Sequence, residues 1–92
     1  MREREVEKKL GLEVKKRGGL CEKWVSGTVG WPDRIVILPD GKIGFVEAKR
    51  PGEEPRPIQV YRHKILRQLG VKVYVLDHPD KIGGILDDIQ TT

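Results

Sequence analysis

Residues 32–49 read PDRIVILPDGKIGFVEAK, and this stretch decides the fold. The β-branched run RIVIL at residues 34–38 is typical of a buried strand, and KIGFVEAK has the composition of a second one. Between them stands Pro-Asp-Gly, in which proline presets φ and glycine accepts a positive φ. The stretch therefore predicts a β-hairpin over residues 34–49.

Upstream of the hairpin the pattern is helical. Residues 3–17 carry Val6, Leu10 and Val14 at every fourth position with charges on the other faces, and a Gly-Gly pair follows. Residues 20–25 alternate imperfectly and predict a strand, in which Cys21 is expected to be half-buried. A glycine-rich loop leads from there into the hairpin.

Downstream of the hairpin, Pro57 is expected to open a second helix that ends at Gly70. We expect its buried face to be formed by four apolar residues: Ile58, Tyr61, Ile65 and Leu69. Residues 71–76 (VKVYVL) predict another strand. A last helix is expected to open at Pro79, and its apolar stripe consists of Ile82, Ile85, Leu86 and Ile89.

The resulting order, αβββαβα, predicts an α/β fold with a mixed sheet flanked by helices. A helix between two neighbouring strands is the usual parallel crossover, so the strands on either side of the second helix should be parallel. With 92 residues and no linker-like segment, the chain is expected to form a single domain over residues 1–92.

Composition narrows the function only modestly. The formal net charge of +4 and the pI of about 9.4 suit a polyanionic partner. One cysteine excludes an internal disulfide and a multi-cysteine zinc site, and His63 and His78 lack a zinc spacing. We expect His63 to be exposed on the second helix and His78 to lie near the cap of the last. No apolar run approaches a membrane span, so a cytoplasmic protein without a membrane partner is expected.

The chemistry is concentrated at the two ends of the hairpin. Asp33 enters the first strand and Glu47 stands near the exit of the second, so both carboxylates could reach one cation. Glu47 and Lys49 share a face because side chains alternate along a strand. Magnesium takes such oxygen ligands, and the carbonyl of Ala48 could be another. Taken singly, Asp33 could be a turn residue, and the other two a solvated strand face.

The stretch GWPDRIVILPDGKIGFVEAKRPGEEPRPIQVYRHKILRQLGVKVYVLD resembles the VRR-NUC domain of the PD-(D/E)XK nuclease superfamily. With the helical EREVE start, the resemblance covers nearly the whole chain and implies a restriction-endonuclease-like core. It implies that Asp33 and Glu47 bind the metal and that Lys49 is catalytic. It also assigns roles to Gln59 on the second helix and to one glutamate of the first helix, Glu3 or else Glu7. Ser26 resembles a serine that could contact phosphate.

Together these features predict an endodeoxyribonuclease that depends on Mg²⁺ or Mn²⁺ and selects DNA by structure. Phosphate contacts are expected from basic residues: Arg34, Arg50, Arg56, Arg62, Lys64 and Arg67. The alternatives are a DNA-binding or scaffolding module without catalysis, and a flap nuclease.

Similarity to Holliday junction resolvases implies a homodimer that cuts four-way junctions. The small core also favours a dimer. So do Trp24 and Trp31 beside the glycine loop, because tryptophan is enriched in protein interfaces.

Overall fold

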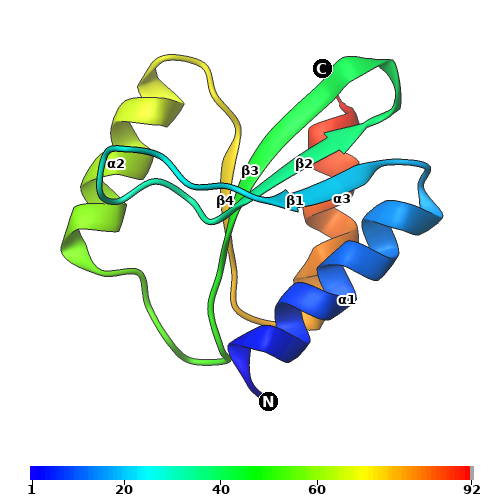
Figure 1. Ribbon diagram of the computed structural model, residues 1–92, viewed down its shortest axis with the longest axis horizontal. Coiled ribbons are helices and arrows are strands. Elements are labelled where there is room, and N and C mark those ends of the chain that lie inside the picture. The colour runs from blue at the N-terminus through cyan, green and yellow to red at the C-terminus, as the bar shows by residue number, and fades with distance from the viewer. Residues whose placement is uncertain (92) are drawn as a thin grey trace.

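The computed structural model describes residues 1–91, and a mixed sheet lies between α2 on one face and α1 and α3 on the other (Figure 1). The αβββαβα order predicted from the sequence is confirmed. The elements are α1 (Glu3–Lys16), β1 (Leu20–Lys23), β2 (Arg34–Leu38), η1 (Pro39–Gly41), β3 (Lys42–Ala48), α2 (Pro57–Gln68), β4 (Val73–Leu76), η2 (Pro79–Lys81) and α3 (Ile82–Gln90), where η denotes a 3-10 turn.

The strands lie in the order β1-β2-β3-β4. The predicted hairpin joins β2 and β3 antiparallel, and its turn places both Asp40 and Gly41 at positive φ. β1 pairs antiparallel with β2, whereas β4 pairs parallel with β3. The parallel pair confirms the crossover expected for the second helix, because α2 connects β3 to β4 across one face of the sheet.

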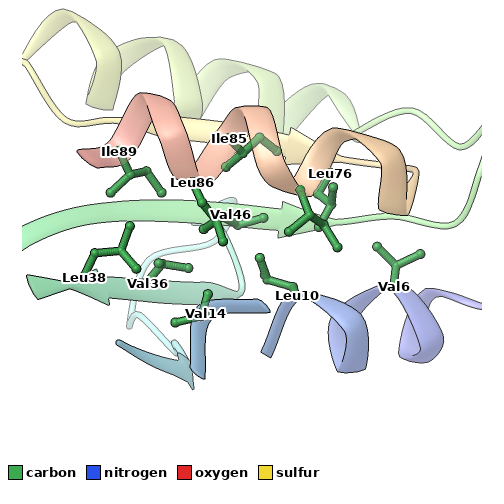
Figure 2. Close-up of a cluster of buried hydrophobic side chains, with 11 residues drawn as sticks. Val6, Leu10, Val14, Val36, Leu38, Val46, Leu76, Ile85, Leu86 and Ile89 are labelled. Atoms are coloured by element: carbon green, nitrogen blue, oxygen red, sulfur yellow. The ribbon is translucent and has the colours of Figure 1, made fainter. Parts of the chain in front are cut away.

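The apolar core fills the space between the sheet and the two helices α1 and α3 (Figure 2). The fourfold spacing on α1 and the stripe on α3 both point into it, as predicted. Each strand from β2 to β4 contributes apolar residues on this face. The core consists of Val6, Leu10, Val14, Val36, Leu38, Val46, Leu76, Ile82, Ile85, Leu86 and Ile89. Cys21 packs half-buried against this core, and burial raises the pKa of its thiol to about 11, so it is a structural residue.

Several strand boundaries differ from the prediction. β1 ends at Lys23 rather than at residue 25, and β4 begins at Val73 rather than at residue 71. Beyond β1, Trp24 turns to pack against Trp31 and Phe45, with ring centroids 6.1 and 5.3 Å away. The two tryptophans thus form a cluster within one chain on the face opposite the main core. This packing accounts for the position of both rings without an interface, and their expected role as interface anchors stays a prediction.

The buried face of α2 is also not the predicted one. Ile58, Tyr61 and Leu69 are 39%, 57% and 76% exposed. The residues that point inward are Gln59, His63 and Leu66, spaced by four and three positions. The end of the sheet that α2 covers carries charged side chains from β3, so polar residues of the helix are buried there. Two polar residues and one apolar residue of α2 are therefore buried where the sequence predicted an apolar face.

The glycine loop lies directly against α2. Gly30 has φ +97°, and an added Cβ would lie 2.6 Å from the carbonyl oxygen of Ile58. Gly70 has a similar φ of +88° but open space around it. We expect Gly30→Ala to destabilise the protein by about 2–4 kcal/mol, from backbone strain plus displacement of the loop. Gly70→Ala should cost only the strain, about 1 kcal/mol. Urea denaturation of both variants measures the difference, and equal losses would contradict this close approach.

Candidate active site

The hairpin brings Asp33 and Glu47 together. Arg34 pairs with Val46, so Asp33, one residue before, and Glu47, one residue after, lie side by side. The Ala48 backbone N–H donates to Asp33 Oδ1 at 3.2 Å, and the Trp24 N–H donates to the Asp33 carbonyl at 2.8 Å. The Asp33 carboxylate is therefore held against the end of β3 in the position predicted from the hairpin.

Glu47, near the end of β3, and Lys49, directly after it, both lie under α2. Their exposed fractions are only 3% and 9%, so the solvated strand face considered for them is excluded. Lys49 Nζ lies 3.8 Å from Glu47 Oε2, and the Lys49 N–H donates to Leu76 O at 2.8 Å. Burial of a charged pair is costly, so this arrangement is retained against a desolvation penalty.

Gln59 on α2 reaches down to Glu47. Its Nε2 donates to Glu47 Oε2 at 3.1 Å, while its Oε1 accepts from the Arg56 N–H at 2.8 Å. The amide is 5% exposed, which excludes an exposed helix residue at this position. Gln59 thus couples the first turn of α2 to the carboxylate of β3.

His63 lies one helical turn after Gln59 and is 1% exposed, so the expectation of an exposed histidine is wrong. Its Nε2 is 3.8 Å from Glu47 Oε1, and neither atom has a hydrogen-bond partner. Burial, with Arg67 and Lys49 nearby, lowers the pKa of His63 to about 4. The imidazole is therefore neutral near pH 7, and its contact with Glu47 is not an ion pair.

The start of α1 adds two further acids. Glu3, Glu7 and Asp33 each offer a carboxylate oxygen, and these oxygens lie within 4.8 Å of one another. Glu7 accepts a hydrogen bond from the Arg34 guanidinium. The charge of Glu3 raises the pKa values of both Asp33 and Glu47, which shows how near it lies to the hairpin acids.

The site has an excess of negative charge. Burial and the neighbouring Asp33 raise the pKa of Glu47 to about 7, although Lys49 opposes the rise. Burial is also the main cause of the raised pKa of Asp33. Carboxylates this close disfavour one another's ionisation unless a cation joins them. The unpartnered Glu47 Oε1 and the oxygen-only donor set fit a hard divalent cation. The acids that could hold it are Asp33, Glu47, Glu3 and Glu7.

The raised pKa of Glu47 predicts an unusual pH dependence. Between its unfolded value of 4.5 and about 7, the native carboxyl holds a proton that the unfolded chain has released. Its contribution to stability is therefore lost as the pH rises through this window. With divalent cations chelated, we expect Glu47→Gln to gain up to about 3 kcal/mol over wild type between pH 4.5 and pH 8.

Urea denaturation at several pH values measures this gain, and the exposed Glu22→Gln is the control. A stability difference between Glu47→Gln and wild type that does not change with pH would contradict the assigned pKa.

Known proteins resemble this chain in sequence and in fold. No family model matches the sequence. The chain is 53% identical over 81 residues to "Putative nuclease p44" of Acyrthosiphon pisum secondary endosymbiont phage 1, with 87% of each chain covered. A solved structure described as a VRR_NUC domain superposes with a TM-score of 0.85 at 33% identity, covering 92% of this chain and 94% of the other. The chain belongs to the VRR_NUC family. The resemblance inferred from the sequence is thus confirmed, together with the α/β fold.

The predicted phosphate-binding residues of this VRR_NUC domain differ in how exposed they are and in how near they lie to the acids. Arg56 lies at the start of α2, near enough to lower the pKa of Glu47. Arg50 is 67% exposed in its side chain and pairs with Glu53 at 3.5 Å. Arg62 is half-buried and lies 5.7 Å from the Tyr61 ring. These three arginines lie on the loop after β3 and on α2.

Other predicted contacts are already engaged within the chain. Arg34 is bound by Glu7, and Ser26 Oγ accepts the Thr28 N–H at 3.1 Å. Arg67 donates twice to the Val73 carbonyl, at 2.9 and 3.1 Å, and so ties α2 to β4. Lys64 is exposed on α2. A role in DNA binding stays a prediction for all of these residues.

Sequence reasoning missed His63. The sequence feature that could have identified it is its position four residues after Gln59, which places both side chains on one face of the helix. His78, in contrast, lies where it was expected. Its Nδ1 accepts the Asp80 N–H at 3.1 Å and so caps η2.

Proposed function

We propose that this VRR_NUC domain is a metal-dependent endonuclease that hydrolyses DNA phosphodiesters and selects its substrate by structure. The coarser statement, that the chain is a nuclease domain, follows from its family. One observation above all supports the finer proposal. Separate elements converge on one spot with carboxylates, a buried lysine and a buried amide, supplied by Asp33, Glu47, Lys49, Gln59 and Glu3.

This convergence argues against a module that only binds DNA. Acids that face a phosphate weaken binding unless a cation screens them, and burying Glu47 beside Lys49 costs stability. A catalytic site gives a reason to retain both features. Bound Mg²⁺ or Mn²⁺ would polarise the phosphate and lower the pKa of the attacking water.

The ligands we propose for the metal are Asp33, Glu47, Glu3 and the carbonyl of Ala48. Glu3 is favoured over Glu7, because Glu7 is occupied by Arg34 and its charge is not among the causes of the raised pKa values.

The protein's own residues divide the remaining tasks. Lys49 projects an ammonium group beside Glu47, where it can orient the attacking water or stabilise charge on the phosphate. Gln59 holds Glu47 Oε2 and so fixes the plane of that carboxylate. Arg56, on the first turn of α2, is placed to neutralise a neighbouring phosphate.

DNA binding is expected to depend steeply on salt. Arg50 and Arg56 are exposed, Arg56 is near enough to lower the pKa of Glu47, and the net charge of the chain is +4. Each neutralised phosphate contributes about −0.9 to the slope of log affinity against log salt. We expect Arg56→Ala to reduce the steepness by about 1 at every DNA sequence tested. Fluorescence anisotropy in Ca²⁺ at several salt concentrations measures the slope. An affinity independent of salt would contradict phosphate-based binding.

The preferred substrate we propose is a four-way junction, cut by a homodimer with paired incisions. A two-fold dimer matches the approximate two-fold symmetry of such a junction. Exposed apolar residues other than the tryptophans support the dimer. Val25 and Val29 on the glycine loop are 79% and 67% exposed, and the loop packs on the part of α2 that carries exposed Ile58 and Tyr61. Such groups are candidates for an interface between copies.

Two measurements test this function. Four-way junctions, flaps and forks are incubated with the pure protein in Mg²⁺ and in excess chelator, and its mass is measured by sedimentation. Paired cuts in junctions by a dimer, only with the metal, are expected. A monomer that cuts flaps alone would show a flap nuclease instead. Metal-independent DNA binding without any cleavage would leave a binding module and end the proposal.

A further inference from the structure

His63 is a buried polar group that the proposed chemistry does not yet use. Its side chain is 1% exposed, and its Nε2 has no hydrogen-bond partner. A buried unsatisfied nitrogen costs roughly 1–3 kcal/mol in a typical protein, so its presence needs a reason. Leu66, three residues later on the same face, shows that an apolar side chain packs well under this helix.

The acceptor that lies near this nitrogen also lacks a hydrogen-bond partner. Glu47 Oε1 is buried, has no hydrogen-bond partner and lies 3.8 Å from His63 Nε2. This separation is too long for a hydrogen bond and too short for a water molecule between the two atoms. Closing it by roughly 1 Å, within the reach of a side-chain rotation, satisfies both atoms at once.

We propose that His63 is a positioning residue that donates its Nε2–H to Glu47 Oε1 and, with Gln59, clamps the Glu47 carboxylate from α2. Gln59 already holds Oε2 at 3.1 Å, and His63 lies four positions further along the same helical face. Two donors on successive turns fix both oxygens and hence the plane of the carboxylate. This inference rests on the proposed function, because the purpose of the clamp is to present Glu47 to the metal.

The clamp leaves the carboxylate able to bind a cation. An ionised carboxylate offers about four lone-pair sites, so each oxygen of Glu47 can accept one hydrogen bond and keep a lone pair for the cation. Partners that orient a metal ligand in this way typically contribute 10- to 100-fold to metal affinity. His63 acts through Glu47, so its loss should weaken metal binding in the absence of any DNA.

The experiment combines metal binding with a measurement on the wild-type imidazole. Mn²⁺ affinity is measured by electron paramagnetic resonance, without DNA, for wild type, His63→Phe, His63→Gln and His78→Asn. Phenylalanine fills the space without a donor, whereas glutamine keeps a donor. His78→Asn removes the other imidazole, which accepts the Asp80 N–H, and keeps a side chain able to accept it. In parallel, ¹⁵N NMR of the metal-free wild type identifies which ring nitrogen of His63 carries the proton and whether that proton exchanges slowly.

We expect His63→Phe to bind Mn²⁺ about 10-fold more weakly. His63→Gln should recover most of that loss, and His78→Asn should be unchanged. The NMR spectrum should show a slowly exchanging proton on Nε2. A folded His63→Phe that binds Mn²⁺ within twofold of wild type would overturn the clamp and leave the proposed function standing. A proton on Nδ1 would overturn it even if the variants fail to fold. Wild type that binds no Mn²⁺ would instead remove the metal site itself.

Discussion

Glu47→Gln is expected to lower DNA cleavage by at least about 10³-fold while the fold is retained. The carboxylate lies 3.8 Å from Lys49 Nζ, accepts a hydrogen bond from Gln59 and feels the charge of Asp33, so it links three other residues of the proposed site. An amide of the same shape keeps the packing but removes the charge that a divalent cation requires. Groups that act as a unit lose most of the rate when one is removed.

Cleavage of a labelled four-way junction under single-turnover conditions measures this loss. Glu22→Gln on the exposed strand β1 is the matched control and should cleave at the wild-type rate. Circular dichroism establishes that both variants fold. A folded Glu47→Gln protein with more than about a tenth of wild-type activity, purified free of contaminating nuclease, would show that the site lies elsewhere.

Lys49→Met is expected to lower the cleavage rate by about 10²–10⁴-fold, the range of a lost proton-transfer or charge-stabilising group. Methionine keeps the aliphatic part of a side chain that is 11% exposed, so the packing under α2 is largely preserved. Metal binding should survive, because an ammonium group is not a ligand. This separation of catalysis from metal affinity distinguishes Lys49 from Glu47.

The rate under saturating DNA and Mn²⁺ affinity are measured on the same preparation. Lys23→Met, exposed at the end of β1, is the control and should match wild type in both measurements. Lys49→Arg should not restore the rate, since the larger planar group does not fit the position of a buried ammonium. Full activity in Lys49→Met would exclude the lysine from the chemistry.

The hairpin explains why so much of the fold was predictable from the sequence. RIVIL and KIGFVEAK are separated by a turn with its own backbone chemistry, so strand pairing and register follow from local residues. The position of Asp33 beside Glu47 follows from that register. The stripe of α3 and the spacing of α1 are equally local signals, and both helices bury the predicted residues.

The face of α2 could not be predicted in the same way, because hydrophobic periodicity assumes that a helix buries its most apolar side. Here the sheet presents Glu47 and Lys49 to the helix, and buried charges need polar partners. Gln59 and His63 therefore face inward, and Tyr61 is left exposed. The packing of the two tryptophans within the chain could not be predicted for a related reason. Phe45, on the same face of β3, offers them an aromatic partner within the chain.

Sequence alone also left open which glutamate of the first helix serves the site. Glu3 and Glu7 are one turn apart and lie on the same face of α1, so periodicity treats them alike. In the structure Arg34 binds Glu7, whereas the charge of Glu3 acts on both Asp33 and Glu47, and this difference is why we propose Glu3 as the ligand. No helix in residues 1–91 is long and apolar enough to cross a membrane.

The most direct test of the proposed metal site is anomalous diffraction from crystals of this protein soaked in Mn²⁺. We predict one strong anomalous peak, which marks a Mn²⁺ ion bound between the acids of the hairpin and those of α1. The ion is expected to contact the carboxylates of Asp33 and Glu47. Glu3 rather than Glu7 is expected to complete the site from α1. A peak that avoids Asp33 and Glu47, or no peak at a Mn²⁺ concentration that supports cleavage, would contradict the proposed metal site.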